Sequence, residues 1–309
     1  MTSVNKPLPP AGISREAKEM LKVFHAENQT QTPDLTIQER RDETRQASAD
    51  NAQNAIDHHR VSVSVDVIAG ITCQIITPEH RTENRCILYL FGGGFCFGSP
   101  FEDLPISAAL AAKTGARVIA PDYRLAPEHP FPAALNDIEA VANAVLADCP
   151  ETLLAGESAG GNLALALCHR LRAQGLATPK AAALFSPATD ISSRGETALA
   201  ETCNDPMLSP DRITEVEALY VPNQDLRNPE ISPIYGRFGP DFPICFITTG
   251  TRDLLLSSCV RLAHVMRQSG ATVDLRVWEG MWHVFEFYPE IPESDASLTE
   301  IADFLESQF

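Results

Sequence analysis

Short apolar runs alternate with amphipathic helical stretches along most of the chain. Six continuous apolar runs, each bounded by turn residues, predict strands that are buried on both faces. They are Cys86 to Phe91, Arg117 to Pro121, Thr152 to Ala155, Ala181 to Phe185, Ile244 to Thr248 and Val273 to Trp278. The helices expected between them carry apolar residues at three- and four-residue intervals and cover 107–113, 132–148, 162–174, 257–268 and 297–307. This alternation predicts a doubly wound α/β domain, with a mostly parallel sheet and helices on both faces.

The pattern before the first of these runs is different. Val61 to Val67 alternates strictly between valine and polar residues, and Ile71 to Ile76 follows it closely. A period of two predicts strands with one exposed face, and we expect these two to form an antiparallel hairpin. The polar stretch 1–59 is expected to be helical around Ser14 to Ala26 and Ile37 to Ala52, and we interpret it as an accessory segment.

Charge and composition exclude several classes of partner. The 309 residues include 24 basic and 41 acidic ones, for a net charge of −17. Nucleic acids and anionic membrane surfaces both need a positive footprint, so neither is expected as a partner. Residues 1–20 lack the apolar core of a signal peptide, and no stretch approaches the length of a membrane span. A soluble, cytoplasmic protein is expected.

No cysteine or histidine pattern indicates a metal or a cofactor. The eight cysteines are scattered, without any Cys-x-x-Cys pair, and most are expected to be small buried residues. His58 and His59 are adjacent, so on any regular element their side chains diverge and make a poor metal pair. We therefore expect neither a metal nor a cofactor.

The segment Gly156 to Gly161, Gly-Glu-Ser-Ala-Gly-Gly, lies between an apolar run and a helical stretch. Glycines around Ser158 permit a strained strand-to-helix turn that exposes the serine hydroxyl above the carboxyl end of a sheet. The motif alone is weak, because Ser158 is explained equally well as a small residue in an ordinary connection. The remaining loops must therefore decide between the two interpretations.

Three further loops follow predicted strands. A triple glycine, Gly92 to Gly94, follows the first buried strand, Asp253 follows the fifth, and His283 follows the sixth. Ligands bind at the carboxyl ends of the strands in such sheets, so we expect these loops to meet near Ser158. The triple glycine exposes backbone amides, although a merely flexible turn would have the same composition.

A serine hydroxyl is a poor nucleophile unless an imidazole accepts its proton, and the imidazole needs a carboxylate to fix its tautomer. Of the eight histidines, only His283 follows a late strand. For the acid, Asp253 is preferred, and Asp190 is the alternative because it follows the fourth strand, one strand earlier. The chain order Ser158, Asp253, His283 is the one expected of an α/β-hydrolase triad.

Five stretches resemble the hormone-sensitive-lipase-like branch of the α/β-hydrolases, which includes the bacterial family IV esterases. They are Phe91 to Phe95, Pro121 to Ala134, Gly156 to Gly161, Gly250 to Leu254 and Trp282 to Phe285. The resemblance implies an eight-stranded, mostly parallel sheet with a helical cap, and a serine carboxylesterase that forms an acyl-enzyme. It further implies that the amides of Gly93, Gly94 and Ala159 form an oxyanion hole.

The resemblance also suggests a division of the chain. Residues 1–59 would be an N-terminal helical cap segment and 60–309 the catalytic domain, with a cap insertion at about 188–240. Family relatives imply short- to medium-chain esters as substrates. Phe95, Phe97 and Phe101, together with Trp282 and Phe285, are expected either to line the substrate pocket or to serve as packing.

Two positions depart from the family pattern. Phe91 replaces the histidine that usually precedes the glycines, and Glu157 replaces the aspartate that often precedes the serine.

Three alternatives to a carboxylesterase stay open: an amidase or peptidase, a lactonase, and a catalytically silent binding protein on the same scaffold. The expected partner is a small ester, and Val273 to Val277 is a candidate edge strand for a homodimer.

Overall fold

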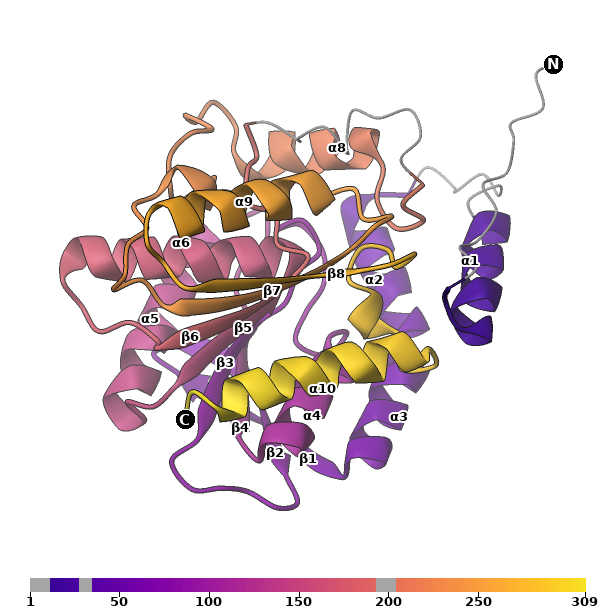
Figure 1. Cartoon of the computed structure of the whole chain (residues 1–309), viewed down its shortest axis with the longest axis horizontal. Helices are drawn as coiled ribbons and strands as arrows, with labels where there is room; N and C mark the ends of the chain where they lie inside the picture. Colours follow the sequence, from indigo (N-terminus) through magenta and orange to yellow (C-terminus); the bar gives the residue numbers. More distant parts are fainter. Residues whose placement is uncertain (1–11, 28–34, 193–203) are drawn as a thin grey trace.

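The computed structural model describes residues 12–27, 35–192 and 204–309. Its centre is an eight-stranded sheet with the strand order β1-β2-β4-β3-β5-β6-β7-β8 (Figure 1). The strands are β1 (Val61–Ile68), β2 (Ile71–Pro78), β3 (Cys86–Leu90), β4 (Arg117–Pro121), β5 (Leu153–Glu157), β6 (Ala181–Phe185), β7 (Ile244–Gly250) and β8 (Val273–Trp278). All eight predicted strands are therefore present, within a few residues of their expected ends.

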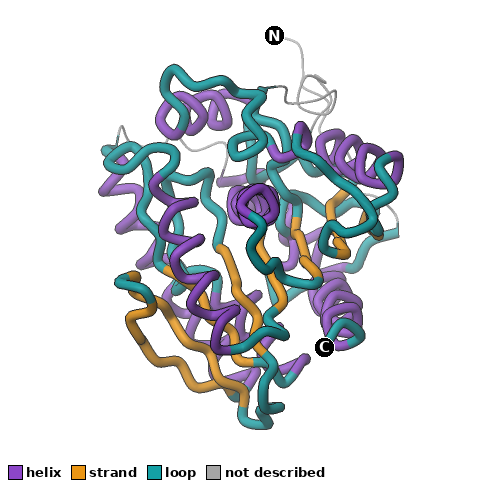
Figure 2. Tube along the Cα trace, turned by 90° about the vertical axis from the view of Figure 1, so that its left-hand side faces the viewer, coloured by secondary structure: helices purple, strands orange, loops and turns teal. Residues whose placement is uncertain are grey.

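The directions of the strands also follow the prediction. β1 and β2 form the expected antiparallel hairpin, in which Val61 lies opposite Pro78, and β2 pairs antiparallel with β4. Every other pair in the sheet is parallel. The sheet twists, so that its strands fan across the view in Figure 2.

Helices cover both faces of the sheet (Figure 1). One face contacts α6 (Ser158–Gln174) and α9 (Leu256–Gln268), and α5 (Ala133–Asp148) packs beside α6. The opposite face contacts α4 (Leu104–Thr114) and α10 (Pro292–Glu306). Central strands such as β3 and β5 are buried along their whole length, which explains why their sequences are continuously apolar.

The helical stretch expected around Ile37 to Ala52 is divided in two and extends beyond its expected end. It forms two helices, α2 (Ile37–Ala47) and α3 (Ala49–His59), which meet at Ser48. A capping box between Thr36 and Glu39 begins α2. At this junction the Ser48 hydroxyl donates a hydrogen bond to the carbonyl of Thr44. No glycine or proline marks this break, so the sequence pattern did not reveal it.

Helix α1 (Arg15–Glu27) packs against the loop that follows β8. Phe24 contacts the rings of Trp282 and Tyr288 at centroid distances of 5.4 and 5.2 Å. The Ser14 amide donates a 2.7 Å hydrogen bond to Glu293 at the start of α10. These contacts bury Trp282 completely, so α1 forms part of the support for the loop that contains His283.

The insertion after β6 contains a helix, α8 (Pro210–Tyr220), and a short 3₁₀ helix, η1 (Pro233–Tyr235). A second 3₁₀ helix, η2 (Phe285–Phe287), follows the His283 loop. Ser209 caps α8 by accepting a hydrogen bond from the Arg212 amide. Residues 193–203 of the predicted insertion, including Cys203, lie outside the described residues. The division into a cap and a catalytic domain stays a prediction.

The order of the strands reverses at β3. The chain passes from β3 to β4 on one side and then crosses to β5 on the other side of β3. The loops after β3 and β5 therefore leave the same edge of the sheet in opposite directions and open a crevice between them. The triple glycine and Ser158 follow these two strands.

Candidate active site

Ser158 lies in a strained turn between β5 and α6. Its φ of +52° is in the left-handed region that side-chain-bearing residues seldom adopt. A Cβ added to Gly160 would lie 2.0 Å from the carbonyl oxygen of Leu90, so only glycine permits α6 to approach β3 this closely. The helix begins at Ser158 itself, four residues earlier than the sequence pattern indicated.

His283 lies within hydrogen-bonding distance of both other predicted residues. Its Nε2 is 2.9 Å from the hydroxyl of Ser158, and its Nδ1 is 3.1 Å from a carboxylate oxygen of Asp253. The carboxylate also accepts hydrogen bonds from the hydroxyl of Thr249 and the amide of Leu255, each at 2.8 Å. Three residues that are far apart in the sequence therefore form one continuous chain of hydrogen bonds.

The alternative acid, Asp190, lies in the same pocket but has a different partner. Its carboxylate forms a 2.8 Å ion pair with Arg261 of α9 and accepts a hydrogen bond from Ser192. The geometry thus favours Asp253, which is completely buried against His283, over Asp190.

Burial and charge together set the ionisation of the pair. Burial by itself would lower the pKa of His283, but the charges of Asp253, Asp205 and Glu157 raise it to about 9. Burial opposes ionisation of Asp253 as well, yet the adjacent imidazole holds the pKa of this carboxyl below its usual value. The pair is therefore arranged to stabilise a positively charged imidazole.

The backbone amides of Gly93, Gly94 and Ala159 all border the cavity in front of Ser158. Within the described residues, none of these three amides donates to a protein acceptor. Gly93 has a φ of +92°, and a Cβ there would lie 2.2 Å from the carbonyl oxygen of Phe97. The triple-glycine loop therefore presents unbound amides next to the serine, as an oxyanion hole requires.

The two departures from the family pattern are both accommodated in the interior. The Phe91 ring stacks on Tyr123 at 4.1 Å, and the Tyr123 hydroxyl donates a 2.6 Å hydrogen bond to the Phe91 carbonyl. The carboxyl group of Glu157 is buried against the Gly92 backbone of the triple-glycine loop, where burial raises its pKa to about 7. Phe91 thus fixes this loop by stacking rather than by a side-chain hydrogen bond.

Asp205 is a site residue that the sequence did not reveal. It lies in the insertion and accepts hydrogen bonds from the amides of Met207 at 2.9 Å and Leu254 at 2.8 Å. A ligating atom of its carboxylate lies within 4.8 Å of those of Asp253 and His283. No spacing signal could have found it, because its position depends on the path of the insertion over the sheet.

This trio of Asp205, Asp253 and His283 has the composition of a small metal site. Its polar atoms are already used, since His283 bonds Asp253 and Asp205 accepts backbone amides. These hydrogen bonds account for the position of each of the three side chains. That the protein uses no metal or cofactor stays a prediction.

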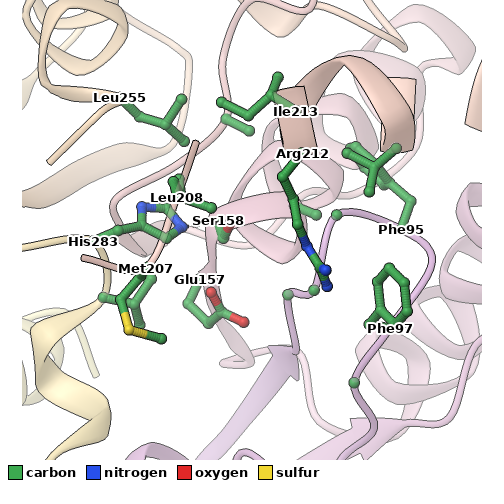
Figure 3. A pocket seen from close by; sticks show the side chains of 18 of the residues that line it. Phe95, Phe97, Glu157, Ser158, Met207, Leu208, Arg212, Ile213, Leu255 and His283 are labelled. Carbon is green, nitrogen blue, oxygen red and sulfur yellow. Dashed lines mark hydrogen bonds between the residues drawn. The ribbon is translucent and has the colours of Figure 1, made fainter. Parts of the chain in front are cut away.

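The cavity in front of Ser158 has a volume of about 440 Å³ (Figure 3). The insertion contributes Met207, Leu208, Arg212 and Ile213 to its wall, and the N-terminal helices contribute Thr44 and Ser48. Phe95 and Phe97 line it as expected, whereas Phe101, Trp282 and Phe285 are packing residues outside the lining. Both parts of the chain interpreted as a cap therefore border the cavity.

The expectation for the cysteines is confirmed for the seven that the structure describes, since all are buried and free. Among the described residues, no helix combines the length and the apolar character that crossing a membrane would require. A cytoplasmic location stays a prediction.

Comparison with known proteins identifies the family. The sequence model of the α/β-hydrolase fold family matches residues 87–287. The chain is 32% identical to an acetyl-hydrolase of Streptomyces hygroscopicus, over 85% of this chain and 89% of that protein. It is 29% identical to an esterase of Acinetobacter venetianus, over 78% and 80% of the two chains.

Solved structures agree with the sequence relatives. The crystal structure of EstE5 soaked with ethyl alcohol is similar with a TM-score of 0.88 and 26% identity, covering 96% of this chain and 99% of that chain. A hormone-sensitive lipase from a metagenome library is similar with a TM-score of 0.87 and 28% identity, covering 94% and 98%. The chain is therefore a member of the α/β-hydrolase family, in the branch of the bacterial hormone-sensitive-lipase-like esterases.

Proposed function

We propose that the protein is a serine carboxylesterase in which Ser158 is the nucleophile, His283 the general base and acid, and Asp253 the residue that orients His283. The observation that carries the proposal is the chain of hydrogen bonds from Ser158 to His283 and on to Asp253. The relatives named as esterases and acetyl-hydrolases support the same class of reaction.

The reaction would have two acyl-transfer steps. His283 removes the proton of Ser158 as its oxygen attacks the ester carbonyl, and the amides of Gly93, Gly94 and Ala159 stabilise the oxyanion. The tetrahedral intermediate collapses to an acyl-enzyme as His283 protonates the departing alcohol. His283 then deprotonates a water that attacks the acyl-enzyme and releases the acid.

The size of the cavity supports small esters as substrates. A volume of about 440 Å³ lies near the low end of the range for small-molecule sites, which is about 300–1,000 Å³. Met207, Leu208 and Ile213 give the wall an apolar surface that suits a short acyl chain. Short- to medium-chain carboxylic esters are the class that we propose.

A comparison of matched substrates tests the function. We expect the enzyme to hydrolyse 4-nitrophenyl acetate and butyrate, and the Ser158→Ala variant to lose this activity. The matched 4-nitroanilides should be hydrolysed far more slowly, because amine leaving groups demand more protonation by His283. Comparable rates on anilides would indicate an amidase instead. Retention of ester hydrolysis by Ser158→Ala would exclude the serine mechanism.

A further inference from the structure

Arg212 brings a positive charge into the cavity of the serine. It lies in the first turn of α8, and its side chain extends into the cavity that Ser158 also lines (Figure 3). The guanidinium carbon lies 4.6 Å from the centre of the Phe97 ring. A ring contact of this kind occupies one face of the guanidinium and leaves its N–H groups available to an acceptor.

Arg212 differs in this respect from the arginine on the same ring. Arg40 also stacks on Phe97, at 5.1 Å, but forms a 2.6 Å ion pair with Glu215. In the part of the chain that the structure describes, the guanidinium of Arg212 has neither an ion pair nor a hydrogen bond. Glu215, an α8 carboxylate whose charge acts on Arg212, is thus already bound to a different cation.

The acidic residues of the cavity do not compensate this charge. Asp190 is bound to Arg261 at 2.8 Å, Asp103 accepts the hydroxyl of Tyr89 at 2.8 Å, Glu102 accepts the hydroxyl of Ser99, and Glu217 also has an interaction of its own. Burial raises the pKa of Asp103 and of Glu157, so both carboxyl groups resist ionisation. Among the described residues that line this cavity, Arg212 is therefore the arginine left for an incoming anion.

We propose that the enzyme acts on esters that carry a carboxylate, and that Arg212 binds this carboxylate while the ester carbonyl lies at Ser158. The inference rests on the proposed function and names its substrate class. A guanidinium binds a carboxylate through two parallel hydrogen bonds, which fixes orientation as well as charge. Partial burial and the charge of Arg40 hold the pKa of Arg212 below its usual value, against the opposing charge of Glu215.

The carboxylate can belong to either half of the ester, so the test needs two pairs of substrates. For the acid half, monoethyl succinate is compared with ethyl 4-oxopentanoate, in which a methyl ketone replaces the carboxylate. For the alcohol half, 3-acetoxypropanoate is compared with 4-acetoxybutan-2-one. Within each pair the shape is nearly the same and the charge differs. The ratio of kcat/KM for the charged over the neutral ester is the quantity measured.

We expect one of the two pairs to show a ratio that Arg212→Met lowers by about 10- to 100-fold, the usual effect of losing a charge-assisted pair. Arg212→Lys should retain part of the ratio, because it keeps the charge and loses the paired geometry. Arg227→Met is the matched control, since Arg227 also stacks on a ring of the insertion, that of Tyr235, but lies outside the cavity lining. This control should leave both ratios unchanged.

Unchanged ratios in Arg212→Met for both pairs, with the neutral esters still hydrolysed, would overturn the inference and leave the esterase function intact. Absence of hydrolysis for every ester would instead contradict the proposed function. Calorimetry tests the inference about Arg212 separately from the esterase function, because monoethyl succinate and 3-acetoxypropanoate can bind to Ser158→Ala without turnover. We expect one of them to bind, and to bind about 10-fold or more weakly when Arg212→Met is added. Equal binding with and without Arg212 would again overturn the inference.

Discussion

At the residue scale, the function depends on the hydrogen bond between His283 and Asp253. Asp253 is completely buried, and its carboxylate also accepts hydrogen bonds from the Thr249 hydroxyl and the Leu255 amide. These bonds fix the orientation of the carboxylate. Asp253→Asn preserves the shape but presents an N–H to His283, which favours the wrong imidazole tautomer. We expect kcat to fall by about 10⁴-fold. Steady-state kinetics on 4-nitrophenyl butyrate measure this, and a loss below about 10-fold would show that Asp253 does not orient the imidazole.

The matched control at this scale is the alternative acid. Asp190→Asn removes the ion pair between Arg261 and a buried carboxylate in the wall of the same pocket. Its effect on kcat should be at least about 100-fold smaller than that of Asp253→Asn, because Asp190 does not contact His283. The reverse order of the two effects would assign the acid to Asp190.

Asp205 should influence the reaction through its charge. His283 must be neutral to accept the serine proton, so kcat/KM rises as the pH passes the pKa of His283, which neighbouring charges raise to about 9. The carboxyl groups that face His283 are Asp253, Asp205 and Glu157. Asp205→Asn removes one negative charge, so the pKa of His283 falls and the rise of kcat/KM moves to lower pH.

A pH–rate profile of the free enzyme checks this direction. Asp211→Asn, at the exposed start of α8, removes an equal charge from the same insertion and should leave the profile in place. If Asp205→Asn lowers kcat/KM at every pH without shifting its rise along the pH axis, Asp205 has only a structural role.

At the scale of elements, the loop after β3 carries the amides of the proposed oxyanion hole. Gly93→Ala would place a Cβ 2.2 Å from the carbonyl of Phe97 at a φ of +92°, so the loop must move. We expect kcat to fall by about 10²- to 10³-fold, as when an oxyanion donor is lost. Gly175→Ala is the control, because Gly175 has a φ of +70° and open space around it. It should lower thermal stability without lowering kcat, and equal kinetic losses in both variants would contradict the assignment.

Much of the strand arrangement, and the meeting of the three site residues, could be predicted from the sequence. Continuous apolar runs predicted β3 to β7, because a strand buried on both faces leaves a continuous signal. The run at Val273 to Trp278 also formed a strand, β8, although it lies at the edge of the sheet and is only partly buried. The proximity of Ser158, Asp253 and His283 could be predicted because each follows a strand of one parallel sheet, whose carboxyl ends share an edge. The alternation of one-sided strands likewise predicted the β1–β2 hairpin.

The structural features that could not be predicted depend on tertiary contacts, which leave no periodic signal in the sequence. The break between α2 and α3 at Ser48 occurs inside a polar stretch that reads as one helix. Asp205 reaches His283 only because the insertion folds back over the sheet and is bound to the amide of Leu254. The start of α10 at Pro292, five residues before the predicted start at Ser297, follows from a proline that is well tolerated in the first turn.

At the scale of the whole molecule, the N-terminal helices connect distant parts of the chain to the site. Arg41 of α2 donates hydrogen bonds to the carbonyls of Cys96 at 2.8 Å and Ala126 at 2.7 Å. Arg40 of α2 forms a 2.6 Å ion pair with Glu215 of α8. We propose that α2 and α8 together act as the cap that selects the substrate, while α1 supports the His283 loop from behind.

The supporting role of α1 can be measured through Trp282. Phe24→Ala removes the ring that packs on Trp282 and Tyr288, so α1 should detach and expose the indole to water. We expect a red shift of tryptophan emission and a loss of stability of about 3 kcal/mol, the order found for buried Phe→Ala changes. Val23→Ala, on the exposed side of the same helix, should change neither. Unaltered emission and melting temperature in Phe24→Ala would show that α1 does not support this loop.

The sheet has two open edges, formed by β1 and β8. The sequence suggested Val273 to Val277 as a candidate dimer edge, and β8 does lie at the edge of the sheet with Val277 exposed. Association of two copies through β8 stays a prediction, which sedimentation analysis at several concentrations would check.

The most direct test of Ser158 as the activated nucleophile is to locate the adduct of a fluorophosphonate probe by mass spectrometry of peptides. Such a probe reacts only with a serine that is activated by a base and faces oxyanion donors, so it examines the nucleophile and its surroundings together. We predict one stoichiometric adduct on Ser158, and labelling of Ser158 at least about 100-fold slower in the His283→Ala variant. An unlabelled Ser158 in the folded, active enzyme, or an adduct on another serine, would contradict it.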